Sequence, residues 1–278
     1  MSPIRSILLH LDSGERSAVR MRIARDLARQ FEASLTTLYA VTSTLLDLPF
    51  ASVAGSSATL ELQEIDAARR AGARALFDKQ LGAGGPTMAW NELVAEPLVA
   101  GFTEQALYAD LLVLGQREPD SPSARDVPAD FIESVLMGSG RPALIVPYAG
   151  DFTSVGGTAL VAWKPSRDAA HAVTAALPLL QRARTVHVAT WAEAPAPSNA
   201  PQLDIVQYLR LHGVQAELRR YGDAPGGVGE SLLSLAADLS ADLLVMGCYG
   251  HSRARELVLG GASRSVLRSM TLPVLMAH

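Results

Sequence analysis

The stretch Leu243-Leu-Val-Met-Gly-Cys-Tyr-Gly250, followed after nine further residues by Gly260-Gly261, decides the fold of this chain. Its first four residues form an apolar run typical of a buried parallel strand, and residues 262–270 predict a helix. Glycines at a strand end allow a sharp turn and a close approach to a ligand. Backbone amides at the start of the next helix attract anions such as phosphate. The order therefore indicates a nucleotide-phosphate loop, although α/β proteins also have such turns without a ligand.

The chain contains an internal duplication. Ala109-Asp-Leu-Leu-Val-Leu-Gly115 recurs as Ala241-Asp-Leu-Leu-Val-Met-Gly247 with one difference, and Pro142 and Pro273 each precede a final apolar run. Repetition at half the chain length predicts two copies of one domain. Glycine and small polar residues near position 150 predict the boundary there. We expect domains at residues 1–150 and 156–278.

Strand and helix patterns alternate within each half, which predicts an α/β fold with one doubly wound parallel sheet per domain. Ligands of such sheets bind beyond the carboxyl ends of the strands. The final strands, residues 143–146 and 274–276, are apolar edges that need covering, so we expect them to pair the two domains. Residues 42–60 break the symmetry. They are a lid, a partner surface or a variable loop with a short helix, and we favour the variable loop.

Composition excludes several classes of protein. The 278 residues are 49% hydrophobic and 19% charged, with a formal net charge of -4, which gives no reason to expect nucleic acid or an acidic membrane as a partner. Cys248 is the single cysteine, so neither a disulfide framework nor a thiolate metal cluster is expected. No apolar run reaches membrane-spanning length. The first ten residues lack the pattern of a signal peptide, and we expect a cytoplasmic protein.

Gly247, Gly250 and Gly260 have the spacing of the motif of the universal stress protein A family. The chain resembles that family in its tandem two-domain form. The resemblance implies an adenine-nucleotide alpha-hydrolase-like fold, with two five-stranded sheets in the order 3-2-1-4-5, domains joined along their last strands, and an ATP site. The nucleotide-binding residues expected in the second half are Gly247, Gly250, His251, Ser252, Gly260, Gly261, Ala262, Ser263, Lys164 and Trp191.

Two positions in the second half depart from the family pattern. Gly261 replaces a Ser or Thr, so that the hydroxyl is missing, while the amides of residues 261–263 remain and Ser263 offers another hydroxyl. Lys164 replaces an aspartate that faces the ribose, and an ammonium group accepts no hydrogen bond. Lys164 is then either a point charge facing phosphate or a solvated surface residue. Trp191 either stacks on a purine or serves packing alone.

The first half keeps the aspartate, as Asp12, but loses the phosphate loop. Glu118 stands near the position of Gly250, while Ala129 and Asp130 replace Gly260 and Gly261. A carboxylate at that helix start would occupy the anion site and repel phosphate. We therefore expect a degenerate copy with a structural or partner-binding role.

The sequence offers few signs of catalysis. It contains neither a P-loop nor a nucleophile elbow, and its six histidines are scattered. We expect no catalytic residue and no metal site. The predicted function is that of a cytoplasmic stress-response regulator that binds ATP or another nucleotide through its second domain, with a protein partner or a homodimer as further associations. The alternatives are an interaction scaffold that has lost ATP affinity and a slow ATP hydrolase.

Overall fold

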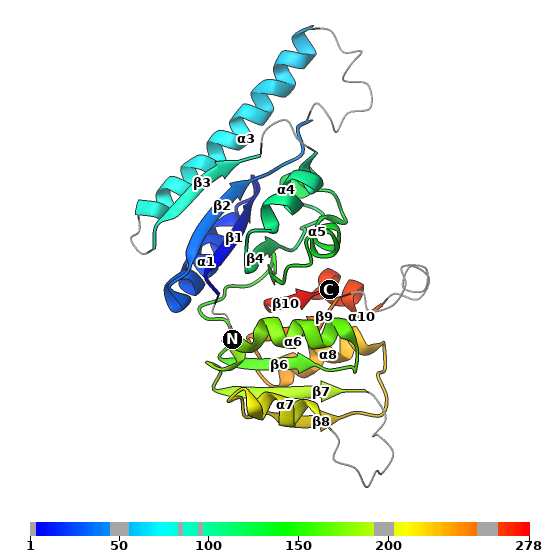
Figure 1. Ribbon diagram of the computed structural model, residues 1–278. Coiled ribbons are helices and arrows are strands. Elements are labelled where there is room, and N and C mark those ends of the chain that lie inside the picture. The colour runs from blue at the N-terminus through cyan, green and yellow to red at the C-terminus, as the bar shows by residue number, and fades with distance from the viewer. Residues whose placement is uncertain (1–3, 45–55, 83–85, 94–96, 192–202, 249–260) are drawn as a thin grey trace. The chain divides into compact units, whose positions relative to one another are not determined.

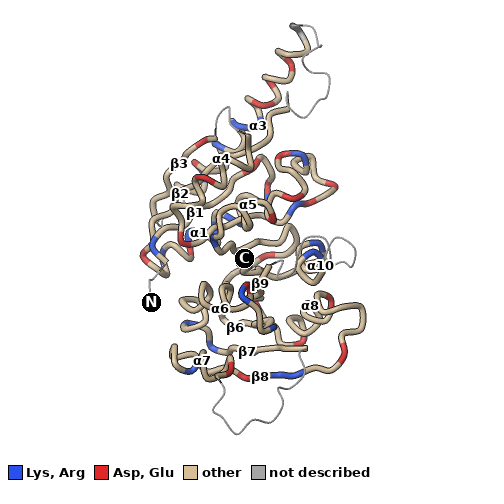
Figure 2. The backbone as a smooth tube through the Cα atoms, turned by 45° about the vertical axis from the view of Figure 1, so that its right-hand side comes forward, with Lys and Arg blue, Asp and Glu red and all other residues tan. Residues whose placement is uncertain are grey.

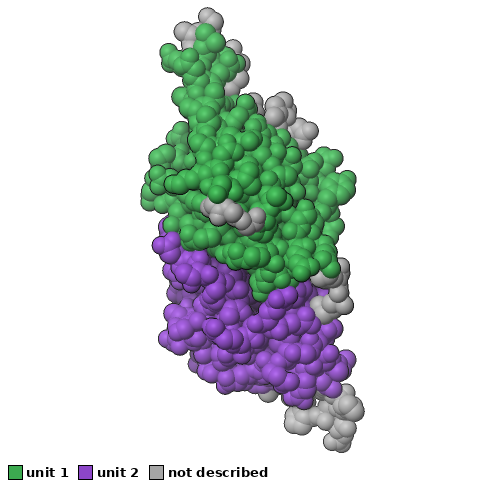
Figure 3. Space-filling view, turned by 90° about the vertical axis from the view of Figure 1, so that its left-hand side faces the viewer, with its two compact units in different colours: residues 1–141 green, residues 142–278 purple. Residues whose placement is uncertain are grey.

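Strands and helices alternate along both halves of the chain in the computed structural model, as the sequence predicts (Figure 1). The structure describes residues 4–44, 56–82, 86–93, 97–191, 203–248 and 261–278. The chain divides into two compact units, residues 1–141 (unit 1) and residues 142–278 (unit 2), which are coloured separately in Figure 3. None of the described helices combines the length and apolarity needed to cross a membrane.

Unit 1 contributes four parallel strands in the order β3-β2-β1-β4. The strands are β1 (Ser6–Leu11), β2 (Ser34–Tyr39), β3 (Met88–Glu92) and β4 (Leu111–Gly115). The helices are α1 (Ser17–Phe31), α3 (Ser56–Gly82), α4 (Leu98–Ala106) and α5 (Phe131–Ser139), with the short 3-10 helix η2 (Pro122–Arg125). Successive residues of β1 and β4 are buried, so both faces of these central strands are covered, as expected of a doubly wound sheet.

Helix α3 is longer than predicted. The sequence favours a variable loop with a short helix over residues 42–60, but residues 56–60 begin a helix of 27 residues, and residues 45–55 lie outside the described part. The pattern misleads because few side chains of α3 are buried, so the helix carries only a weak apolar stripe.

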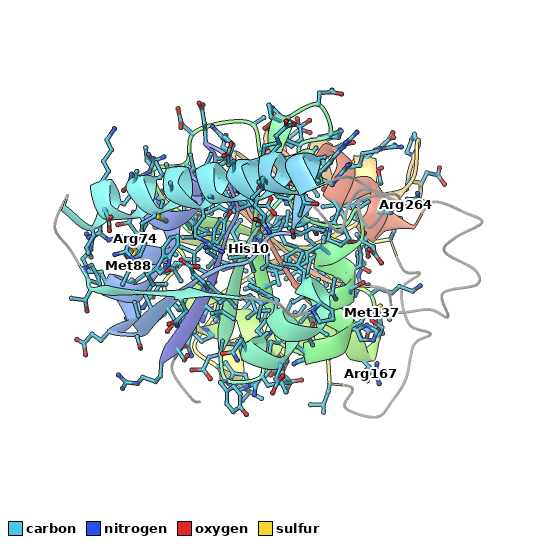
Figure 4. The ribbon with its side chains drawn as sticks, turned by 90° about the horizontal axis from the view of Figure 1, so that it is seen from above. His10, Arg74, Met88, Met137, Arg167 and Arg264 are labelled. Atoms are coloured by element: carbon cyan, nitrogen blue, oxygen red, sulfur yellow. The ribbon has the colours of Figure 1, made fainter. Side chains whose placement is uncertain are left out.

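The C-terminal half of α3 fastens the helix to the rest of unit 1. Ala73 and Phe77 are buried, and the Arg74 guanidinium lies 5.2 Å from the centre of the Trp90 ring on β3 (Figure 4). The N-terminal half extends away from the strands (Figure 1) and leaves Leu60 60% exposed.

Unit 2 contains a complete repeat, with five parallel strands in the order β8-β7-β6-β9-β10. The strands are β6 (Thr158–Ala162), β7 (Thr185–Thr190), β8 (Glu217–Arg220), β9 (Leu243–Gly247) and β10 (Val274–Ala277). The helices are α6 (Arg167–Leu180), α7 (Ile205–Leu211), α8 (Val228–Asp238) and α10 (Ala262–Ser269). Counted from β6, the order is 3-2-1-4-5, as the resemblance implies.

Strand β5 (Ala143–Val146) closes the first repeat, yet it belongs to unit 2. It pairs antiparallel with β10, and Leu144 lies opposite Leu275. The predicted pairing of the two final strands is therefore confirmed. Unit 1 holds the order β3-β2-β1-β4 and unit 2 the order β8-β7-β6-β9-β10, so the predicted fold class, two doubly wound α/β repeats, is confirmed as well.

Candidate functional site

Six of the ten predicted site residues are described, and they belong to the segments that leave β6, β7 and β9 in unit 2. They are Lys164 after β6, Trp191 after β7, Gly247 at the end of β9, Gly261 before α10, and Ala262 and Ser263 in the first turn of α10. The other four, Gly250, His251, Ser252 and Gly260, lie outside the described residues.

The strand register brings Lys164 and Trp191 to neighbouring strand ends. Ala162, the last residue of β6, lies opposite Ala189 of β7, and the Trp163 N–H donates to the Ala189 carbonyl at 2.8 Å. Lys164 and Trp191 each follow this pair by two residues. Since adjacent strands lie about 4.8 Å apart, the two residues are neighbours at the carboxyl edge.

Gly247 is held against the backbone of α6. A Cβ atom at this position would lie 2.6 Å from the Ala169 nitrogen and 2.7 Å from the Asp168 carbonyl carbon. Because both neighbours are backbone atoms, a change of rotamer would not relieve the overlap. Glycine at the end of β9 therefore allows the first turn of α6 to pack directly on the strand exit.

The helix starts of unit 2 differ in what they offer to an anion. Ser166 caps α6 and Asp168 lies in its first turn; Asp204 caps α7; Glu230 lies in the first turn of α8. Helix α10 follows Gly261, which makes no side-chain capping bond, and its first turn has no acidic residue. Amides at a helix start lack partners within the helix and carry the positive end of its dipole. Among the described helices of unit 2, α10 has the N-terminus best suited to an external anion.

A positive side chain adds to this polarity. Arg264 lies on an exposed position in the first turn of α10 (Figure 4), whereas Arg268 lies in the last turn; Figure 2 colours both arginines blue. Ser263 is buried at 5% exposure, so its place in the first turn is fixed by packing. No three His, Cys, Asp or Glu side chains of the described residues group so that they could hold a metal ion.

The Trp191 ring has two partners. It stacks on the Tyr221 ring, with centroids 5.1 Å apart and planes 23° from parallel. Its indole Nε1–H donates to the Asp223 carbonyl at 3.1 Å. The orientation of the indole is thus set by contacts that the sequence does not reveal, because Tyr221 follows a different strand.

Comparison with known proteins identifies unit 2. The model of the Universal stress protein family matches residues 157–278. Residues 157–278 form a universal stress protein domain. A universal stress protein of Synechocystis sp. is 44% identical over 50 residues, which are 18% of this chain and 17% of that relative's own length. The resemblance inferred from the sequence is therefore confirmed.

Solved structures extend the likeness in fold to the whole chain. A universal stress protein from Archaeoglobus fulgidus is 18% identical, with a TM-score of 0.71 over 98% of this chain and 96% of that chain. A protein of unknown function from Pseudomonas aeruginosa is also 18% identical, with a TM-score of 0.60 over 99% and 92% of the two chains. At such identities the likeness concerns the fold alone.

The equivalent strand exits of unit 1 differ from those of the universal stress protein domain. Ile7 lies opposite Leu111 as Ala159 lies opposite Leu243, so Asp12 is equivalent to Lys164. The Asp12 carboxylate pairs with the Arg20 guanidinium at 2.7 Å. It also accepts hydrogen bonds from the Ser17 hydroxyl at 2.8 Å and the Gly14 N–H at 2.9 Å.

These partners satisfy Asp12 within the protein. Burial raises the pKa of the Asp12 carboxyl, but Arg20 and the hydrogen bonds outweigh burial and hold the pKa below its ordinary value. The Arg20 side chain also lies against Gly115, the equivalent of Gly247: a Cβ there would overlap the guanidinium Nη1. A protein side chain therefore covers the strand exit that a ligand would use.

A second buried carboxylate lies beside Asp12, but it is not the one that the sequence suggests. Asp130 precedes α5 without capping it and accepts from the Ser134 hydroxyl at 3.0 Å. Asp126 is the buried carboxylate, 1% exposed. It accepts the Ser13 N–H at 2.6 Å and pairs with Arg69 of α3.

Sequence analysis missed Arg20, Arg69 and Asp126. Arg20 had a signal, because it occupies the apolar face of α1 at helical spacing from Ala24 and Leu27, and all three are buried. Arg69 had none, since its partner is 57 residues away in the chain.

Proposed function

We propose that the universal stress protein domain of unit 2 binds one nucleotide, with ATP the leading candidate, at the carboxyl ends of β6, β7 and β9. The observation that carries the proposal is the start of α10, which combines Gly261 with an acid-free first turn. Phosphate would accept hydrogen bonds from the amides of residues 261–263. Gly250, His251, Ser252 and Gly260 would complete the phosphate loop, with Lys164 and Trp191 facing the sugar and base.

Unit 1 supports the proposal by contrast. Its corresponding edge holds the Asp12–Arg20 and Asp126–Arg69 ion pairs, and its helix α5 has Glu133 in the first turn. An entering phosphate would have to displace protein side chains and face added negative charge. The domain in unit 2 would then serve as the nucleotide-dependent part of a cytoplasmic stress-response regulator, and unit 1 as its structural or partner-binding copy.

Two alternatives use the same fold. An interaction scaffold without nucleotide affinity would purify free of nucleotide and give no heat on titration with ATP. A slow ATP hydrolase would release phosphate from ATP at a rate that an α10 variant abolishes. One experiment distinguishes the scaffold from the two nucleotide-binding functions: the protein is purified and denatured, and the supernatant is assayed for released nucleotide.

The stoichiometry of binding is the first prediction. We expect calorimetric titration with ATP to give at most one site per chain, because ion-paired side chains of unit 1 occupy the strand exits where a nucleotide would bind. The variant Gly261→Asp should abolish this binding while α10 stays folded, since Asp is a good N-cap residue but adds a charge that repels phosphate. Gly261→Asn is the matched control, which caps the helix without the charge. Two equivalent sites in the wild-type chain would contradict the assignment.

A second prediction concerns Lys164. We expect Lys164→Asp to tighten ATP binding about 10- to 150-fold, the effect of gaining a charged hydrogen bond to the ribose. Lys164→Gln, which removes the ammonium group and adds no carboxylate, separates the loss of positive charge from the gain of an acceptor. If Lys164 faces the phosphates, the aspartate variant will bind ATP more weakly instead, and our placement of the ribose is wrong.

A further inference from the structure

The segments that follow β7 and β8 carry an aromatic pair in register. Thr190 lies opposite Arg220 at the ends of the two strands, and the Tyr221 N–H donates to the Thr190 carbonyl at 2.9 Å. Trp191 and Tyr221 are therefore the next opposed residues. Their rings stack, with centroids 5.1 Å apart and planes inclined by 23°.

The stack fixes the direction in which each ring faces. When two rings on adjacent strands stack, their planes are roughly perpendicular to the line that runs from one strand to the next. Tyr221 therefore covers the face of Trp191 on the β8 side, and the opposite face of the indole is turned toward β6. Lys164, which follows β6, lies on that side, next to the exit of β9 where Gly247 ends the strand.

We propose that Trp191, backed by Tyr221, is the stacking platform for the base of the bound nucleotide, and that Tyr221 is a positioning residue for it. The inference rests on the proposed function and names how its ligand is selected. Stacking on aromatic side chains tolerates every base because each has a π face. The Asp223 carbonyl already takes the indole Nε1–H, so this N–H is not available to read the base edge.

Selection would therefore follow the ring area of the base. We expect purine nucleotides to bind more tightly than pyrimidine nucleotides, with adenine and guanine nucleotides binding alike. A pocket that reads base edges by hydrogen bonds would separate adenine from guanine strongly, because a buried polar group would lose its partner with the wrong base.

Unit 1 shows that the platform is not a general feature of the repeat. By register, Ala40 is equivalent to Trp191 and Leu93 to Tyr221, since the Leu93 N–H donates to the Tyr39 carbonyl. Unit 1 does stack Tyr39 on Trp90, but Arg74 of α3 lies over the Trp90 ring. The aromatic pair at the strand exits thus occurs in the repeat whose α10 start suits an anion.

The test compares ligands that share phosphates and differ in the base. Wild-type protein is titrated by calorimetry with ATP, GTP, CTP and inorganic tripolyphosphate. We expect ATP and GTP to agree within about twofold and to bind more tightly than CTP and tripolyphosphate. Trp191→Leu should weaken ATP about 5- to 150-fold and leave tripolyphosphate unchanged. Tyr221→Leu should weaken ATP about 2- to 13-fold, and Tyr221→Phe, which keeps the ring, should weaken it less.

Trp163→Leu is the matched control. Trp163 directly follows β6, so it is a tryptophan at a neighbouring strand end, but successive residues of a strand alternate sides, and Trp163 is on the side opposite to Lys164. It should leave ATP affinity unchanged. If tripolyphosphate binds and ATP binds no more tightly than tripolyphosphate, the stacking platform is wrong while the phosphate site stands. The same holds if the protein binds ATP much more tightly than GTP. If neither tripolyphosphate nor ATP binds, the proposed function and the platform both fall.

Discussion

Replacing Arg20 by Met is expected to lower the free energy of unfolding of unit 1 by about 3 kcal/mol, the low end of the cost of breaking a buried ion pair. Arg20 and Asp12 are 4% and 16% exposed and lie 2.7 Å apart. Without the guanidinium the Asp12 carboxylate would stay largely buried, with only the Ser17 hydroxyl and the Gly14 N–H as partners. The low end applies because Asp12 keeps some contact with water.

The measurement is urea unfolding of the full chain in a Trp163→Phe, Trp191→Phe background, so that Trp90 fluorescence reports unit 1. The double variant Arg20→Met, Asp12→Leu is the control. It removes both charges, and it should recover most of the lost stability, because an apolar pair can replace a buried ion pair without net cost. A single variant as stable as the parent would show that Asp12 does not depend on Arg20.

Acidification from pH 7.5 to pH 5 is expected to destabilise unit 1 through His10 by about 2 kcal/mol. His10 is 2% exposed, its Nε2 bonds the Ala40 carbonyl at 2.8 Å, and its ring packs against Phe102 and Phe131. Burial lowers the pKa of His10 from 6.5 to about 4, and Arg20 adds to this, while Asp12 and Asp126 oppose it.

The sign follows from which state binds the proton. Between pH 6.5 and about pH 4 the unfolded chain binds a proton at His10 and the folded chain does not, so stability falls as the pH falls through this window. The depressed pKa of Asp12 acts below the window. The control is His10→Gln, whose amide can still donate to the Ala40 carbonyl but does not titrate. An equal loss of stability in both proteins between pH 7.5 and pH 5 would contradict this account.

The sequence predicts the fold well because the repeats reveal themselves in buried strands. The Leu-Leu-Val runs before Gly115 and Gly247 are buried in both repeats. A parallel strand that is covered on both faces needs such a continuous apolar run, so the run predicts the strand. Helix α3 escapes prediction for the opposite reason, since its N-terminal half buries little that would leave a periodic pattern.

The contacts of the candidate site were less predictable than the strands that carry it. The sequence predicts Trp191 and Gly247 as site residues from their positions at strand ends. What touches them depends on pairing between segments far apart in the chain: Tyr221 follows the neighbouring strand β8, and the backbone of Ala169 packs on Gly247. Composition does not encode such pairs, and the register of the sheet sets them.

The antiparallel pairing of β5 with β10 makes the covering of the β10 edge independent of protein concentration. A two-fold axis between two separate single repeats would also place their last strands antiparallel, but that contact would weaken on dilution. Here both strands belong to one polypeptide. The edge of β10 is therefore covered by an intramolecular partner at any expression level, whereas a fragment beginning at residue 156 would lack β5 and expose that edge to other chains.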